Sequence, residues 1–213
     1  MGEVRLGRSH SRTDELTGRA RPVLALLGVL ETRYSDLTHH GRTVGIYCRA
    51  LGRRFGLAED RLELAGRLHD VGKVAVSESV LCKPEALTPE EWRQVKCHPE
   101  VGAQLLFEAE LDDVANWVIA HHERPDGRGY PYGLFDEDIP LEAKILSVVD
   151  AFDAMTSERV YQPAQTVSDA VDELQRGAGR QFDGAVVDAF VATVGRRSAR
   201  DDVPLVLTKR PRP

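Results

Sequence analysis

The chain has 213 residues, of which 42% are hydrophobic, 29% charged and 6% aromatic. This apolar share supplies a sizeable core and excludes a wholly disordered chain, and the 18 Gly and 11 Pro exclude a collagen-like one. The net charge of −6 argues against a cationic protein that binds nucleic-acid polymers. Most of the seven histidines lie beside Asp, Glu or another His, and imidazoles and carboxylates are metal ligands.

The sequence carries no sign of a membrane or secretory protein. No run approaches the ~20 apolar residues of a membrane span, and the first residues lack the order of a signal peptide. Cys48, Cys82 and Cys97 form no CxxC motif, which argues against a disulfide framework and a cysteine zinc site. We therefore expect a cytoplasmic protein with reduced thiols and no membrane contact.

The hydrophobic pattern is helical almost throughout. Polar residues 1–17 are expected to form a flexible lead-in, residues 18–195 the main domain, and residues 196–213 a flexible basic tail. Apolar side chains recur at helical spacing and predict helices over residues 19–33, 37–55, 58–71, 111–122, 141–155, 166–175 and 183–194. Only residues 74–81 alternate enough to predict a short strand or hairpin.

A further helix has a clear start at Thr88. Its hydroxyl can cap the helix, Pro89 suits the first turn, and Glu91 completes a capping box. We expect this helix to break near Pro99 and to resume beyond it. Residues 123–140 are dense in Gly and Pro and predict a loop.

Histidines and acids gather at five places along these helices. The places are His39-His40, His69-Asp70, His98-Pro99-Glu100, His121-His122-Glu123, and Asp150 with Asp153. A single histidine of this kind is better explained as an ordinary core or surface residue than as a metal ligand. Buried polar groups need partners, however, and a metal cluster would satisfy all of them together. Because neighbours such as His69 and Asp70 point in different directions on a helix, they could serve two adjacent metals.

Several motifs carry a family resemblance. His69-Asp70-Val71-Gly72-Lys73 resembles the HD signature of metal-dependent phosphohydrolases, and residues 121–131 resemble the HHExxDGxGYP loop of the HD-GYP domain family. Segments 83–84, 87–92, 98–100, 150–157 and 177–183 are similar to the same family and follow in its order. The resemblance covers about residues 21–194 and implies an all-α fold, an HD-superfamily helical bundle with a Gly/Pro-rich GYP loop.

The resemblance also implies a centre of two or three divalent metals, iron or alternatively manganese. The ligands that it implies are His40, His69, Asp70, His98, His121, His122 and Asp150, with Asp70 as the bridge between two metals. Asp36, one helical turn before His40, would add a third metal, although Asp is also a favoured N-cap residue.

The activity implied by the resemblance is hydrolysis of cyclic di-GMP to pGpG or GMP by a metal-activated hydroxide, with Asp70 and Lys73 in the catalytic machinery. Lys73 and Arg159 are expected to contact phosphate, and Gly129, Tyr130 and Pro131 to contact the nucleotide. Each also has a plainer interpretation: Lys73 and Arg159 as surface cations, and Tyr130 as packing under the turn.

Two alternatives to this activity remain open. Pro125, Val160 and Gln162 depart from the family pattern, which fits an HD phosphohydrolase acting on another nucleotide or cyclic dinucleotide. The other alternative is a non-catalytic module that docks its GYP loop onto GGDEF-domain proteins. A separate regulator and a homodimer also stay open. Glu123 and Asp126 are either residues that orient ligands or solvated loop acids.

Overall fold

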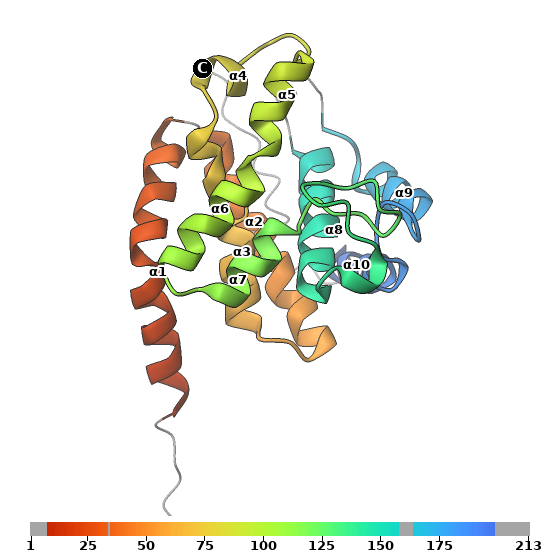
Figure 1. The fold of residues 1–213 in the computed structure, drawn as a ribbon. Coiled ribbons are helices and arrows are strands. Elements are labelled where there is room, and N and C mark those ends of the chain that lie inside the picture. The colour runs from red at the N-terminus through yellow and green to blue at the C-terminus, as the bar shows by residue number, and fades with distance from the viewer. Residues whose placement is uncertain (1–7, 34, 158–163, 199–213) are drawn as a thin grey trace, which may run out of the picture.

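The computed structural model describes residues 8–33, 35–157 and 164–198, which form an all-α bundle (Figure 1). Its elements are α1 (Arg8–Arg33), α2 (Ser35–Phe55), α3 (Glu59–Leu68), η1 (Val71–Ala75), α4 (Glu78–Leu81), α5 (Pro89–Lys96), α6 (His98–Glu108), α7 (Asp112–Ile119), η2 (Asp136–Asp138), α8 (Leu141–Thr156), α9 (Val167–Gly177) and α10 (Gly184–Ser198). No β-strand occurs in the described ranges, and the all-α fold class is confirmed.

The bundle is organised around the pair α2 and α3, which pack closely against each other. Their backbones meet at two glycines: a Cβ placed on Gly66 would lie 2.7 Å from the Cα of Gly45. Helix α8 packs against α2, whereas α6 packs on α7 and η1, and α9 and α10 adjoin α8 (Figure 1). The absence of side chains at the crossing thus brings the ligand-bearing parts of α2 and α3 together.

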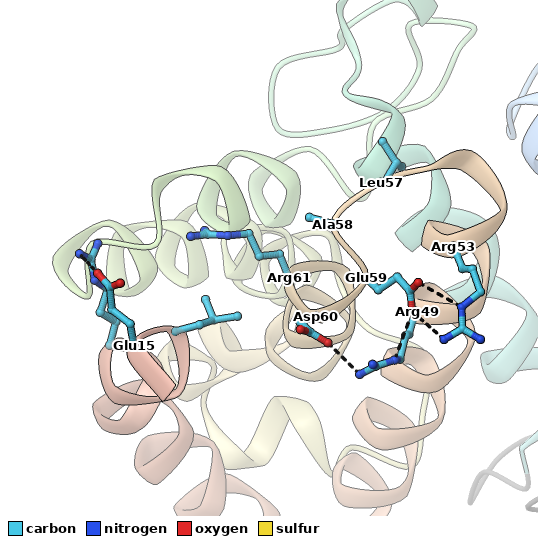
Figure 2. A pocket seen from close by; sticks show the side chains of 10 residues that line it. Glu15, Arg49, Arg53, Leu57, Ala58, Glu59, Asp60 and Arg61 are labelled. Atoms are coloured by element: carbon cyan, nitrogen blue, oxygen red, sulfur yellow. Dashed lines mark hydrogen bonds and ion pairs between the residues drawn. The ribbon is translucent and has the colours of Figure 1, made fainter. Parts of the chain in front are cut away.

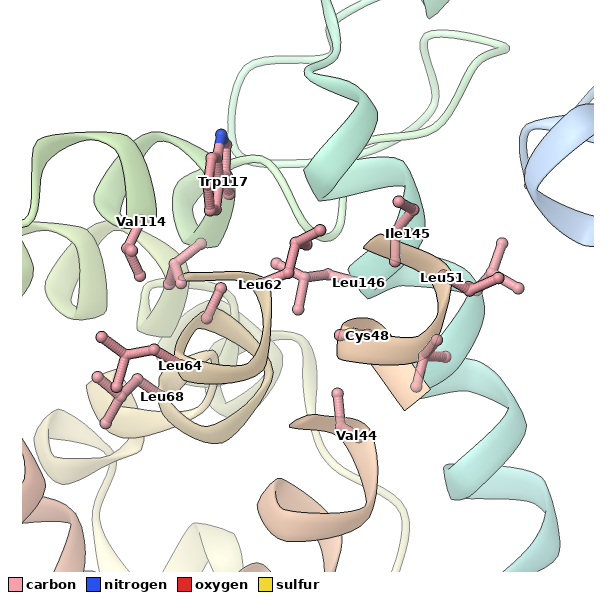
Figure 3. Close-up of a cluster of buried hydrophobic side chains, with 14 of the residues drawn as sticks. Val44, Cys48, Leu51, Leu62, Leu64, Leu68, Val114, Trp117, Ile145 and Leu146 are labelled. Carbon is pink, nitrogen blue, oxygen red and sulfur yellow. The ribbon is translucent and has the colours of Figure 1, made fainter. Parts of the chain in front are cut away.

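One apolar cluster fixes four of these helices relative to one another (Figure 3). Its buried side chains include Val44, Cys48 and Leu51 of α2, Leu62 and Leu68 of α3, Val114 and Trp117 of α7, and Ile145 and Leu146 of α8. Burial of such side chains contributes about 1.5–3 kcal/mol each. The helices that carry or directly precede most of the predicted ligands therefore share one core.

The first helix is longer than the sequence pattern predicted. Helix α1 begins at Arg8 and has 26 residues, so residues 8–17, for which the polar sequence predicts a flexible lead-in, are helical. Its outer part is polar and carries an i,i+4 ion pair from Arg19 to Glu15 at 2.8 Å. An apolar stripe could not reveal a helical segment whose sequence contains so few apolar residues. Despite the length of α1, no helix among the described residues has the length and apolarity needed to span a membrane.

The strand predicted over residues 74–81 is wrong. This segment instead holds the end of η1 and the short helix α4. Val76 and Val80 are buried while Val74 is 40% exposed, so the buried positions are four residues apart as in a helix. The apparent alternation came from two consecutive short helical turns.

The predicted helix start at Thr88 is confirmed. The Thr88 side chain accepts a hydrogen bond from the Glu91 amide at 3.3 Å, and the Glu91 carboxylate accepts one from the Thr88 amide at 2.7 Å. The expected break falls at Cys97, between α5 and α6. The capping box therefore fixes the start of the helix that ends next to His98.

Substitution of Gly72 tests the close approach of η1 to α6. A Cβ at Gly72 would lie 1.9 Å from the carbonyl oxygen of His98 and 2.5 Å from the amide nitrogen of Gly102. Because the obstacles are backbone atoms, Gly72→Ala should lower the free energy of unfolding by about 1–3 kcal/mol or more in urea denaturation.

The matched control is Gly28→Ala, in the interior of α1, where a Cβ meets nothing within 4 Å. It should be neutral or stabilise the protein by up to about 1 kcal/mol. Equal effects of the two substitutions would contradict the packing described.

Candidate metal centre

Three of the predicted histidine ligands lie just beyond the end of a helix, and each uses that end in the same way. The Nδ1 atoms of His69, His98 and His121 lie 2.8, 2.7 and 2.5 Å from carbonyl oxygens three residues earlier, at Gly66, Val95 and Val118. A carbonyl oxygen can only accept, so each Nδ1 carries the proton and donates. Each Nε2 is therefore left with a lone pair for a metal.

These Nε2 atoms converge on Asp70 and Asp150. In one group, His40 Nε2 lies 3.1 Å from both His69 Nε2 and Asp150 Oδ1. In the other, His98 Nε2 lies 3.4 Å from His121 Nε2. Asp70 stands between the groups: Oδ1 is 3.6 Å from His98 Nε2, and Oδ2 is 3.5 Å from His69 Nε2.

The donor atoms fit divalent metals. Three sets have ligand atoms within 4.8 Å of one another: His98 with His121 and His122, His40 with His69 and Asp150, and His69 with Asp70 and His121. Imidazoles and carboxylates that converge in this way can hold divalent transition metals. The overlap of the sets at His69 and His121, with Asp70 between the two groups, gives the cluster room for two adjacent ions.

The two carboxylates are held in their ionised form. Burial raises the pKa of Asp70, but the charges of Lys73 and of the neighbouring histidines outweigh it and hold the pKa well below its usual range. The Lys73 ammonium donates to Asp70 Oδ2 at 2.6 Å. Burial likewise raises the pKa of Asp150, but the adjacent imidazoles of His40 and His69 outweigh it and hold the pKa well below its usual range. Both carboxylates are therefore available as anionic ligands.

The imidazoles divide into two kinds. Burial lowers the pKa of His98, lowers that of His122 to about 3, and together with neighbouring histidines lowers that of His121 well below its usual range. These rings are neutral at pH 7 and ready to coordinate. Burial also lowers the pKa of His40, but hydrogen bonds to Asp150 and Asp153 outweigh this effect and raise the pKa to about 9.

His40 needs a different partner because it lies inside a helix. Its position in α2 leaves the preceding carbonyls engaged in the helix, whereas the other three histidines follow helix ends. Its Nδ1 instead lies 2.7 Å from Oδ2 of Asp153, a residue of α8 that is 5% exposed. Asp153 thus performs the orienting role that a carbonyl performs elsewhere in the cluster.

The loop over residues 123–140 is held against the centre by a buried acid. The Glu123 side chain, in a residue 2% exposed, accepts hydrogen bonds from the amides of Tyr132, Gly133 and Leu134 at 2.6, 3.1 and 3.0 Å. The Tyr130 ring stacks on His122 with centroids 4.7 Å apart. Glu123 is therefore a structural anchor of the loop, and the interpretation of it as a solvated acid is wrong.

A family model described as "HD domain" matches residues 25–186, well over half of the 213 residues. The chain belongs to the HD domain family. The motif that names the family, His69-Asp70, lies at the centre of the cluster described above.

Curated relatives of this HD domain include proteins named as phosphodiesterases. The cyclic di-GMP phosphodiesterase response regulator RpfG of Xanthomonas campestris is 43% identical over 147 residues, covering 66% of this chain and 39% of its own length. The 3'3'-cGAMP-specific phosphodiesterase 2 of Vibrio cholerae is 37% identical over 175 residues, covering 79% and 34%. The cyclic di-GMP phosphodiesterase of Thermotoga maritima is 35% identical over 177 residues, covering 79% and 48%. The chain thus spans between 34% and 48% of the length of these relatives.

Solved structures share the fold. Bd1817, an HDGYP-type protein from Bdellovibrio bacteriovorus, aligns with a TM-score of 0.61 at 23% identity, covering 75% of this chain and 52% of that one. The HD domain of the phosphodiesterase PgpH from L. monocytogenes aligns with a TM-score of 0.56 at 15% identity, covering 81% and 98%.

The structure brings together seven of the predicted ligands: His40, His69, Asp70, His98, His121, His122 and Asp150. Lys73 contacts Asp70, so its ammonium is engaged within the cluster. Tyr130 and Gly129 line a cavity beside His122, and Pro131 follows them half-buried. Asp36 falls within α2, but its side chain lies outside what the structure describes, as do Arg159, Val160 and Gln162 entirely.

Sequence reasoning missed Asp153 as a partner of His40. A signal existed, because Asp153 follows Asp150 by three residues and therefore shares its face of α8. That spacing alone did not separate a buried partner from a surface charge.

Asp153→Asn tests the support of His40. An amide cannot accept as strongly from Nδ1 and can present its own donor to it, so His40 should lose its fixed orientation. We expect metal affinity to fall about 10–100-fold, measured by metal titration with the helical content checked by circular dichroism. Glu142→Gln, in the first turn of the same helix, is the control. Unchanged affinity in Asp153→Asn would contradict this role.

Glu123→Gln tests the anchoring of the loop. An amide nitrogen facing three N–H donors leaves hydrogen bonds unmade, so the free energy of unfolding should fall by about 1–3 kcal/mol. Hydrogen exchange at residues 132–134 should become faster than in the wild type. Glu137→Gln, at an exposed position of the same loop, should change neither quantity. Unaltered exchange in Glu123→Gln would show that the carboxylate does not hold the loop.

Proposed function

We propose that this HD domain is a metal-dependent phosphodiesterase that hydrolyses cyclic di-GMP to pGpG or GMP. The observation that carries the proposal is the position of Asp70 between two imidazole groups, one on each of its oxygens. A carboxylate so placed can bridge two metals. Paired ions of this kind are suited to phosphodiester hydrolysis.

The proposed metals are iron or alternatively manganese. The ligand sets contain imidazole and carboxylate groups and no thiolate, a mixture that suits these ions. When bound, two such ions polarise the phosphate and supply a water-derived nucleophile at neutral pH.

The residues of the chain itself have separate tasks in this proposal. Asp150 and Asp70 bring negative charge that favours two cations at close range. Lys73 holds Asp70 by a 2.6 Å hydrogen bond and adds a positive charge beside the centre, where the phosphate of the substrate would lie. Tyr130, stacked on His122, forms the boundary between the ligands and the cavity that opens beside them.

A second candidate substrate is 3'3'-cGAMP. The observation that favours it is that two relatives named as 3'3'-cGAMP-specific phosphodiesterases, at 36% and 37% identity, are as similar to this chain as several of those named for cyclic di-GMP. A non-catalytic module docking onto GGDEF-domain proteins is less well supported, because the seven ligands that converge are all present.

Removal of single ligands tests the proposal. Asp70→Ala and His40→Ala should each lower turnover of cyclic di-GMP at least about a hundredfold and lower the bound metal, because each removes a donor of the paired site. Metal counting on anaerobically purified protein, followed by product analysis, provides the measurement. His39→Ala is the matched control, since His39 is exposed next to His40.

The outcomes separate the candidates. Retained turnover in Asp70→Ala would overturn the site assignment. Fast hydrolysis of 3'3'-cGAMP with indifference to cyclic di-GMP would replace the first substrate by the second. Metal-loaded protein without turnover of any cyclic dinucleotide would favour the docking module.

A further inference from the structure

A cavity of about 490 Å³ opens beside the metal centre, between α5 and the loop over residues 123–140. Its lining begins at His122, one of the candidate ligands, and continues over Tyr130 to Trp92 and Lys96 of α5, with Arg128 and Gln181. The volume lies in the range of about 300–1,000 Å³ that is typical of small-molecule sites. Anything that reaches the centre from this side lies against these residues.

Helix α5 presents an aromatic and a cationic side chain to the cavity. Trp92 and Lys96 are four residues apart and therefore share one face of the helix. Trp92 is 48% exposed, although tryptophan is usually well covered in a domain of this size. The Lys96 ammonium lies 5.2 Å from the centroid of the Tyr130 ring, a cation–π contact between two residues that line the cavity.

Two cations of this cavity, Lys96 and Arg128, make no close ion pair within the described ranges, although the charge of Arg128 helps to lower the pKa of Asp126. Among the described residues, neither Lys96 nor the Arg128 guanidinium has an ion pair or a side-chain hydrogen bond to a carboxylate. Arg124 also lines the cavity, but it pairs with Asp126 through bonds of 3.0 and 2.7 Å. Two cations thus remain available to an anionic ligand.

A second and larger cavity provides a contrast (Figure 2). It measures about 850 Å³ and is also rich in arginine, but each guanidinium there meets a carboxylate. The pairs are Arg19–Glu15, Arg49–Glu63, Arg53–Glu59 and Arg61–Asp113. The arginines of the larger cavity are therefore engaged in ion pairs with neighbouring carboxylates. In the smaller cavity, Lys96 and Arg128 can still contact an anionic ligand.

We propose that the smaller cavity is a subsite for the half of a cyclic dinucleotide that is not being cleaved. A purine base would stack on the indole of Trp92, and the second phosphate would lie between Lys96 and Arg128. The chemistry is that of nucleotide binding generally: an aromatic face for the base and charge-assisted hydrogen bonds for the phosphate. Gln181 would add an amide for the edge of the base. The subsite rests on the proposed function, since it assigns the second half of the same substrate.

The main experiment compares two phosphodiesters on the metal-loaded protein. Lys96→Met with Arg128→Gln should raise KM for cyclic di-GMP at least about tenfold, the effect of losing one charge-assisted hydrogen bond. Hydrolysis of bis(p-nitrophenyl) phosphate, which has neither a second phosphate nor a purine, should keep its kcat/KM within about twofold, and the metal content should not change. Arg93→Gln is the control, because it removes a charge from the same helix at an exposed position that pairs with Glu90.

Two results would overturn the subsite. An unchanged KM for cyclic di-GMP would show that the two cations do not contact the substrate. An equal loss on both phosphodiesters would show that the substitutions damage the metal centre rather than a distal contact.

Tryptophan fluorescence tests the base contact without relying on turnover. The chain has two tryptophans, and Trp117 is 9% exposed within the core. Rapid mixing of the metal-loaded protein with cyclic di-GMP should quench the emission of Trp92, and Trp92→Leu should lose the quench. A quench that persists in Trp92→Leu, or its absence in the wild type, would overturn the base contact.

This measurement separates the two proposals. If the wild type cleaves bis(p-nitrophenyl) phosphate but no cyclic dinucleotide, the proposed function fails. A quench by cyclic di-GMP that requires Trp92 would support the subsite even then.

Discussion

The hydrogen bond from a histidine Nδ1 to one of the last carbonyls of the preceding helix is the interaction on which the centre depends. A helix leaves its final carbonyls without intrahelical partners, and a histidine just past the end can satisfy one of them. At His69, His98 and His121 this single bond closes the helix, fixes the tautomer and turns Nε2 toward Asp70. At the ends of α3, α5 and α7, the same hydrogen bond therefore both caps the helix and orients a candidate metal ligand.

The centre is not symmetric about Asp70. One side combines His40 and His69 with Asp150, and Asp153 stands behind His40. The other side consists of His98, His121 and His122, all with lowered pKa values because they are buried. A cation on the first side meets more negative charge than a cation on the second. The two positions should therefore differ in affinity, with the carboxylate-rich side the tighter.

The sequence was informative where a local pattern decides the structure. The capping box at Thr88 and the helical spacing of the apolar residues are local, and the adjacent His69 and Asp70 share one short segment. The sequence was uninformative where a residue's structure depends on a contact with a residue far away in the chain. Asp153 meets His40 across 113 positions, and residues 74–81 form helical turns because Val76 and Val80 pack inward. The polar start of α1 escaped detection because it has little apolar surface to bury.

Helix α5 contacts both the candidate metal centre and the cavity beside it. Its last turn supplies the Val95 carbonyl that orients His98, and the same helix carries Trp92 and Lys96 toward the cavity. None of its residues is buried, so its position depends on the Thr88 cap, the Lys83–Glu91 ion pair and the short junction to α6. A shift of α5 would move the candidate ligand His98 and the cavity wall together. The substrate contacts proposed for Trp92 and Lys96 would thus be coupled to the geometry of the candidate metal centre.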